Sequence, residues 1–187
     1  MVLQIDFALW ALLAVVWLVA APFSHATVRR EPLGSRLRYL LPAALFAFAL
    51  RFGAPFAPWV MARFIPATWW SGVVSVALTA LGIAFALWAR AALGRNWSGT
   101  VTVKEGHALI QDGPYAIARH PIYTGAVIAL VGTMIGAGTV VALLGVAAVV
   151  VALRSKMAVE ERFMTEEFGQ AYADYRRRVK KLVPFVW

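Results

Sequence analysis

The sequence has no cysteine and few charged residues. Of its 187 residues, 14% are charged and 61% are hydrophobic, whereas soluble domains are about one quarter charged and about half apolar. The absence of cysteine excludes a disulfide framework, a thiolate metal site and a cysteine nucleophile. A chain of this length cannot bury so much apolar surface in water, so we expect an integral membrane protein.

Acidic residues are scarce as well. Nine Asp and Glu residues stand against 18 Lys and Arg residues, which gives a formal net charge of +9. The basic residues flank the apolar runs instead of forming a patch on a soluble face, and this placement is typical of a membrane topology signal. We therefore expect the lipid bilayer, and no nucleic acid, as the partner of this charge.

Several catalytic motifs are also missing. The three histidines, His25, His107 and His120, are too few for the histidine-rich cages of membrane di-iron enzymes, so no metal is expected. The sequence lacks Gly-x-Ser-x-Gly, Gly-x-Gly-x-x-Gly and the phosphate-binding glycine-rich loop. These absences remove support for a serine hydrolase, a dinucleotide-binding enzyme and a nucleoside triphosphatase.

Long apolar runs are what the sequence does contain. Residues 7–23 and 64–89 are uncharged and long enough to cross a bilayer. A signal peptide would explain the first run too, but no Lys or Arg precedes it. Residues 39–62 form a further run that Arg51 and three prolines interrupt, which favours a broken helix followed by an interfacial loop.

The last run, residues 121–153, has no charged residue. As one helix it would be about 50 Å long, well beyond a hydrocarbon core of about 30 Å. Gly132, Gly136 and Gly138 lie near its middle, where a turn costs little. We predict two short helices in a tight hairpin, with the Gly132-x-x-x-Gly136 pair providing close helix packing.

After this hairpin, Phe168, Tyr172, Tyr175 and Val179 recur at spacings of four, three and four, which predicts an amphipathic C-terminal helix on the membrane or on the preceding loop. The predicted fold is an all-α integral membrane protein with about five transmembrane helices and this cytoplasmic C-terminal helix. We expect one membrane domain, 1–187, made of an N-terminal two-helix part, 1–63, and a core with a cofactor pocket, 64–187.

The distribution of basic residues predicts the orientation. If the runs cross as described, 16 Lys and Arg residues fall on one side, and only Arg51 and Arg63 fall on the other. The positive-inside rule then places the C-terminus in the cytoplasm and the N-terminus outside the cell membrane.

Three groups of polar residues lie on that cytoplasmic side: the loop 105–115, the stretch 119–125, and residues 156–161. Pro121 suits the first turn of a helix, so Arg119 and His120 should sit beside free backbone N–H groups, a ready anion site. A second interpretation of these residues is structural. Arg119 would anchor the helix at the lipid headgroups, and Tyr123 would belong to an aromatic belt.

Glu160 and Glu161 directly follow an apolar stretch. We expect them at a helix end, where acids oppose the helix dipole and where Lys156, one turn back, pairs with Glu160. A solvated turn explains such a pair. Alternatively, Glu160 faces a bound cation or a ribose.

Taken together, these groups resemble the isoprenylcysteine carboxyl methyltransferases, with related bacterial membrane and phospholipid methyltransferases. The resemblance covers roughly residues 94–184. Its residues are His107-x-Leu109-Ile110, Gly113-Pro114-Tyr115, Arg119-His120-Pro121-x-Tyr123-x-Gly125, Glu160-Glu161, Phe168-Gly169, Tyr172 and Tyr175.

The resemblance implies S-adenosyl-L-methionine as the cofactor and Arg119 and Glu160 as catalytic residues. It also implies cofactor contacts from the loop, from the stretch at Pro121 and from Glu160: His107, Ala108, Leu109, Ile110, Tyr115, His120, Pro121, Ile122, Tyr123 and Glu160. At the position of the family's acceptor-binding arginine stands Lys156, which keeps the charge but loses the two-pronged grip on a carboxylate.

The resemblance therefore predicts a membrane methyltransferase that acts on a lipophilic acceptor. The carboxylate of an isoprenylated cysteine-like compound is one candidate acceptor, and a phospholipid or another amine is the alternative. A protein of another class, a non-catalytic lipid-binding or assembly factor, would fit the same scaffold.

Overall fold

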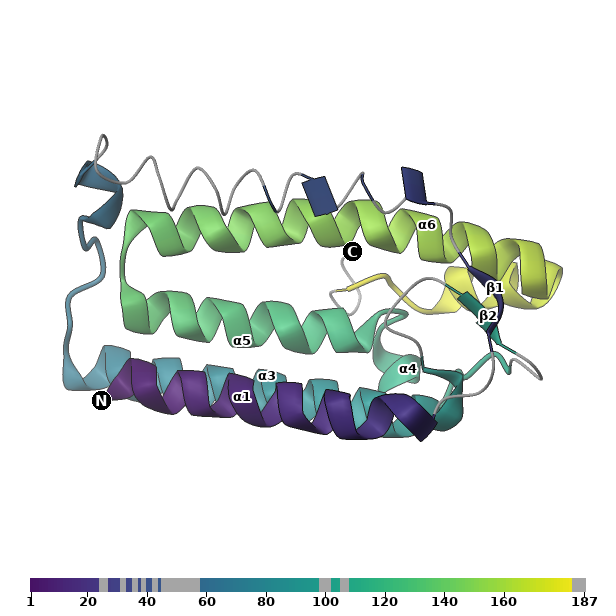
Figure 1. Ribbon diagram of the computed structural model, residues 1–187, viewed down its shortest axis with the longest axis horizontal. Coiled ribbons are helices and arrows are strands. Elements are labelled where there is room, and N and C mark those ends of the chain that lie inside the picture. Colours follow the sequence, from purple (N-terminus) through teal and green to yellow (C-terminus); the bar gives the residue numbers. More distant parts are fainter. Residues whose placement is uncertain are drawn as a thin grey trace.

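The computed structural model describes residues 1–23, 27–30, 33–34, 37, 40–41, 44, 58–97, 102–104 and 108–182. In the described part, four long helices run along one common direction (Figure 1): α1 Val2–Ala20, α3 Trp69–Leu93, α5 Pro121–Ala137 and α6 Val140–Arg178. Shorter elements connect them: η1 Ala21–Phe23, β1 Thr27–Arg30, η3 Pro58–Met61, η4 Gly94–Asn96, β2 Thr102–Lys104 and α4 Pro114–Ile117.

Three of the described segments are long and apolar enough to cross a membrane: Val2–Phe23, Trp69–Leu93 and the apolar part of Val140–Arg178. Pro121–Ala137 is a shorter apolar helix. At 1.5 Å per residue its 17 residues reach about 26 Å, close to the thickness of a hydrocarbon core. Four of the five expected helices are thus found, and the run 39–62 lies mostly outside the described residues.

Local sequence signals explain where the long helices begin and end. Thr68 caps α3: its Oγ1 accepts from Ser71 N at 3.1 Å, and its own N–H donates to Ser71 Oγ at 2.9 Å. Pro121 opens α5, and Gly138, with φ of +63°, closes it. Thr139 then caps α6.

The hairpin of α5 and α6 is confirmed, with its turn at Gly138, but one of its helices is not short. α6 continues past the apolar part into charged sequence and reaches Arg178, spanning 39 residues with a kink at Gly169. Lys, Arg and Glu have good helix propensity, so the charged residues after position 153 extend the helix beyond the apolar part. Glu160 and Glu161 therefore lie inside a helix, and the prediction that they mark a helix end is wrong.

α3 and α5 pack with their backbones in direct contact. A Cβ on Gly82 would lie 2.4 Å from the carbonyl oxygen of Gly125, and one on Gly132 would lie 2.6 Å from Thr79 N. A Cβ on Gly136 would lie 2.4 Å from Ser75 Oγ. The prediction that Gly132 and Gly136 serve close helix packing is confirmed, and this packing fixes the start of α5 against α3.

α1 begins before the apolar run that starts at residue 7, so the helix includes Asp6. Asp6 is fully buried and accepts a hydrogen bond of 2.7 Å from Ser75 Oγ. Trp10 Nε1 donates to Thr133 Oγ1 at 3.0 Å. Since α1 is otherwise largely exposed, these polar contacts attach it to α3 and α5.

The elements at one end of the bundle bring distant segments together (Figure 1). β1 pairs with β2 in an antiparallel two-stranded sheet, and α4 lies at the same end as the start of α5. α6 passes this end and breaks at Gly169, where φ is +49°. The residues after the break, 170–178, turn back toward α4, where the Tyr175 hydroxyl donates to Tyr115 O. Of the two placements expected for this helix, the structure shows the one on the preceding loop.

Candidate functional site

His120 lies between two carboxylates at the start of α5. Its Nδ1 is 3.3 Å from Glu160 Oε2, and its Nε2 is 3.3 Å from Glu161 Oε1. An ionised carboxylate only accepts hydrogen bonds, so both ring nitrogens carry a proton in this arrangement. Burial alone would lower the pKa of His120, but the hydrogen bonds and charges of Glu160 and Glu161 raise it above its ordinary value. The two carboxylates therefore favour the imidazolium form of His120.

Glu160 is the more accessible of the two acids. Its side chain is 23% exposed, whereas that of Glu161 is 8% exposed. The hydroxyl of Tyr123 donates a hydrogen bond to Glu160, and the ring of Tyr123 stacks on His120 at 5.7 Å between centroids. Glu160 thus keeps one side open while two neighbours fix its position.

Lys156 lies one turn before Glu160 on the same helix. Its Nζ is 5.4 Å from the centroid of the Tyr123 ring, close enough for a cation–π contact. The positive charge of Lys156 contributes to lowering the pKa of Glu160. The predicted acceptor-binding lysine is therefore next to the open carboxylate.

Glu161 contacts cationic groups from two different segments of the chain, residues 119–120 and Lys181. Arg119 donates to Glu161 Oε1 from Nε at 3.0 Å and from Nη2 at 2.7 Å, and Lys181 Nζ lies 3.1 Å from Oε2. Glu161 lies beyond residue 153, outside the apolar part of α6. Burial alone would raise its pKa, but the hydrogen bonds from His120 and Arg119 lower the pKa to about 2. Glu161 is thus a buried, ionised carboxylate that contacts several cationic groups.

The backbone N–H groups before α5 are already bonded. Arg119 N donates to Lys180 O at 2.8 Å, and His120 N donates to Lys181 O at 3.1 Å. The C-terminal segment supplies these carbonyls, so the N–H groups of Arg119 and His120 themselves are not available to an anion. Local spacing around Pro121 could not show this, because the partners are about 60 residues away.

Tyr115 connects the loop to the end of the chain. The hydroxyl of Tyr175 donates to Tyr115 O at 2.6 Å, and the Tyr172 and Tyr175 rings are 6.0 Å apart. Both Tyr115 and Tyr175 are buried, and burial raises the pKa of each hydroxyl, so both remain neutral.

The structure describes most of the other predicted cofactor residues. Pro121 is buried and Ile122 is half-buried at the start of α5. Leu109 and Ile110 are half-buried and Ala108 is exposed in the loop before α4. His107 lies outside the described residues. The structure therefore brings His120, Tyr123, Lys156 and Glu160 into one cluster and leaves the role of each as a prediction.

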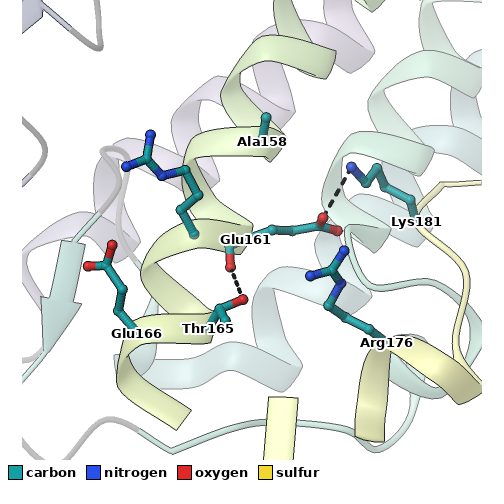
Figure 2. Close-up of a pocket in the computed structure, with 7 residues that line it drawn as sticks. Ala158, Glu161, Thr165, Glu166, Arg176 and Lys181 are labelled. Carbon is teal, nitrogen blue, oxygen red and sulfur yellow. Dashed lines mark hydrogen bonds and ion pairs between the residues drawn. The ribbon is translucent and has the colours of Figure 1, made fainter. Parts of the chain in front are cut away.

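An open hollow of about 480 Å³ adjoins the cluster on the Glu161 side of α6. Figure 2 shows Glu161 reaching from α6 toward Lys181 and Arg176, with Glu166 on another side of the helix. The described lining residues come from α6 and the C-terminal part: Ala158, Glu161, Arg162, Thr165, Glu166, Arg176 and Lys181. They include none of the predicted cofactor residues.

Sequence reasoning did not assign to Glu161 its contacts with several cations, and it assigned no role to Lys181 or Thr124. Thr124 Oγ1 donates to Leu182 O at 2.8 Å. Residue spacing carried no signal for these contacts, since each joins segments more than 15 residues apart. Among the described residues, no group of three or more His, Asp or Glu could hold a metal ion.

The fold and site define a class: a helical membrane protein with a buried ionic cluster where a hairpin meets the C-terminal part. The family description "Phospholipid methyltransferase" matches residues 70–171, which span α3, α5 and most of α6. The chain belongs to this family, and the resemblance to the isoprenylcysteine carboxyl methyltransferases is confirmed.

Individual relatives agree with this membership. Protein-S-isoprenylcysteine O-methyltransferase B of Arabidopsis thaliana is 31% identical over 121 residues, covering 63% of this chain and 61% of the relative. Methanethiol S-methyltransferase 2 of Bradyrhizobium diazoefficiens is 43% identical over 72 residues, covering 37% of this chain and 26% of the relative. The chain thus spans about three fifths of the length of the plant relative.

A solved structure has the same fold. The eukaryotic intramembrane Ras methyltransferase, isoprenylcysteine carboxyl methyltransferase, superposes with a TM-score of 0.54 and 26% sequence identity. The match covers 79% of this chain and 52% of that protein.

Proposed function

We propose that this chain is a membrane methyltransferase that uses S-adenosyl-L-methionine to methylate a lipophilic acceptor. The family match across α3, α5 and α6 carries the proposal, because the same segments hold His120, Tyr123, Lys156 and Glu160 in one cluster. The basic loops at this end favour a cytoplasmic site and C-terminus in the cell membrane.

The chemistry of the cluster fits the proposed cofactor. Glu160 offers a partly exposed carboxylate, which suits a cationic or hydroxyl-bearing ligand, and half-buried Leu109 and Ile110 offer apolar surface for a nucleobase. Bound there, S-adenosylmethionine supplies an electrophilic methyl group on a sulfonium. We propose that the predicted set binds it: His107, Ala108, Leu109, Ile110, Tyr115, His120, Pro121, Ile122, Tyr123 and Glu160.

The residues of this chain then have to orient two reactants and exclude water. His120 and Tyr123 fix the Glu160 carboxylate, so that its charge is in place before a ligand arrives. Lys156 is the proposed contact for the acceptor. Opposite unit charges 4 Å apart attract by about 4 kcal/mol at an effective dielectric constant of about 20, so a carboxylate acceptor gains from a dry site.

The acceptor itself has several candidates. The relatives carry O-methyltransferase and S-methyltransferase in their names, and the family is named for phospholipids. A lysine at position 156 binds an anion as a point charge and does not select a planar carboxylate as arginine would. We propose an isoprenylated cysteine-like carboxylate as the acceptor, with a phospholipid amine as the second candidate.

Purified protein in lipid nanodiscs tests the proposal. We expect saturable binding of S-adenosylmethionine by isothermal titration calorimetry. We also expect transfer of a labelled methyl group to an S-farnesylated N-acetylcysteine, with phosphatidylethanolamine and methanethiol as competing acceptors. A folded wild-type protein that does not bind the cofactor would instead support a non-catalytic lipid-binding or assembly protein.

A further inference from the structure

Glu161 lies at the centre of the ionic cluster but is the less accessible of its two acids. Its Oε1 accepts hydrogen bonds from Arg119 and His120, and its Oε2 lies 3.1 Å from Lys181 Nζ. Its side chain is 8% exposed, against 23% for Glu160. The two adjacent acids therefore have different environments: Glu161 is bound on both oxygens by protein cations.

The cations of Glu161 belong to a strap formed by residues 179–182 and to the stretch that the strap covers. The backbone carbonyl oxygens of Lys180 and Lys181 accept hydrogen bonds from the backbone N–H groups of Arg119 and His120, at 2.8 and 3.1 Å. Leu182 O accepts from Thr124, and Val179 O accepts from Arg119 Nη1. The strap thus lies along the start of α5 through both backbone and side-chain bonds.

Charge balance makes Glu161 the critical member. Arg119, His120 and Lys181 are three cations gathered around one carboxylate. Without that carboxylate they would repel one another in a buried place, and the Nε and Nη2 donors of Arg119 would lose their partner. The same loss would leave the ring of His120 with Glu160 alone.

We propose that Glu161 is a positioning residue that holds the strap, residues 179–182, on the start of α5 and fixes the ring of His120, while Glu160 and Tyr123 face the ligand. This role deepens the proposed methyltransferase function and rests on it. It assigns the two acids of one Glu-Glu pair to separate tasks.

The surroundings of His120 define the readout. From α6, Glu160 and Glu161 face its two nitrogens, and from α5 the ring of Tyr123 stacks on it. Lys181 and Arg119 act on His120 through the shared Glu161 carboxylate. Removing Glu161 removes one of two anions and leaves both cations, so the titration of His120 must move to lower pH.

The test uses the full chain in nanodiscs without cofactor and compares Glu161→Gln with Glu167→Gln, the same change at an exposed position of α6. Imidazole NMR, with the signal assigned through His120→Gln, gives the titration midpoint. Hydrogen exchange gives the protection of the Arg119 and His120 amides. We expect Glu161→Gln to lower the midpoint by about one unit and to speed up amide exchange about tenfold, with Glu161→Asp partly restoring both.

Unchanged titration and unchanged exchange in Glu161→Gln would overturn the proposal. If Glu161→Gln does not fold, Lys181→Met is the second variant. Lys181→Met removes one contact that holds the strap, and Glu161 keeps Arg119 and His120 as partners. It should speed up exchange without lowering the His120 midpoint, and wild-type exchange rates in this variant would also overturn the proposal. Cofactor binding by the wild type is a separate measurement, so a failure of the proposed function is distinguished from a failure of this role.

Discussion

At the residue scale, the site depends on contacts between charged groups far apart in the chain. The sequence pattern predicted His120, Tyr123, Lys156 and Glu160 as site residues, and the structure brings these four together. The pattern predicted these residues because each of them lies in a short sequence motif with characteristic spacing. It could not show which acid of the Glu160-Glu161 pair is open, since that depends on the helix face and on Lys181.

The ion pairs of His120 and Glu161 predict a pH range of maximum stability. His120 has a raised pKa in the folded state, so its contribution is complete below its ordinary value of 6.5 and is lost as the pH rises through the folded value. Glu161 has a lowered pKa, so its contribution is present above the ordinary 4.5 and is lost as the pH falls toward about 2. Thermal unfolding in detergent should show a decline on the alkaline side that is absent in His120→Gln. The same alkaline decline in that variant would show that other groups cause it.

Lys156 predicts how the acceptor is held. Lys156→Arg restores the planar two-pronged group, so we expect the KM for a carboxylate acceptor to fall about fivefold and the Kd for S-adenosylmethionine to stay unchanged. Steady-state methyl transfer and calorimetry measure the two constants. A change confined to the cofactor Kd would place Lys156 on the cofactor and not on the acceptor.

At the element scale, small residues decide how the helices pack. The glycines in the last apolar run predicted both a hairpin turn and close packing, and Gly138 and Gly132 fulfil these roles. The length of α6 was not predictable from hydropathy, because the helix continues into charged sequence after the apolar part ends. The break at Gly169 had no hydropathy signal either, although a glycine at φ of +49° is the residue expected there.

Gly132 predicts the stability of the α3–α5 contact. A side chain at this position would meet Thr79 N at 2.6 Å, and backbone cannot move away as a flexible side chain can. We expect Gly132→Val to destabilise the protein by about 3 kcal/mol, while Ala77→Val on the exposed face of α3 has little effect. Denaturation in mixed micelles measures both, and equal stability of the two variants would contradict the packing.

At the scale of the whole molecule, two loops predicted on the same side of the membrane meet in the structure. β1 comes from the first basic loop and β2 from the loop after α3, and the two strands pair. The division into 1–63 and 64–187 stays a prediction, as does the side of the membrane on which the basic end lies.

The absence of cysteine makes that side measurable. Ala67→Cys and Ala108→Cys place single thiols at exposed positions before α3 and after it. A membrane-impermeant maleimide should label Ala67→Cys in intact cells and Ala108→Cys only in inverted vesicles. Labelling of both from the same side would contradict the proposed topology.

The central claim is that the cluster of His120, Tyr123 and Glu160 binds S-adenosylmethionine. Calorimetry on nanodiscs of the wild type, Glu160→Gln and the exposed control Glu167→Gln tests it most directly. Loss of a charged hydrogen-bonding group should weaken binding by about tenfold or more in Glu160→Gln and leave Glu167→Gln like the wild type. Equal affinity in all three proteins would place the cofactor elsewhere and contradict the account.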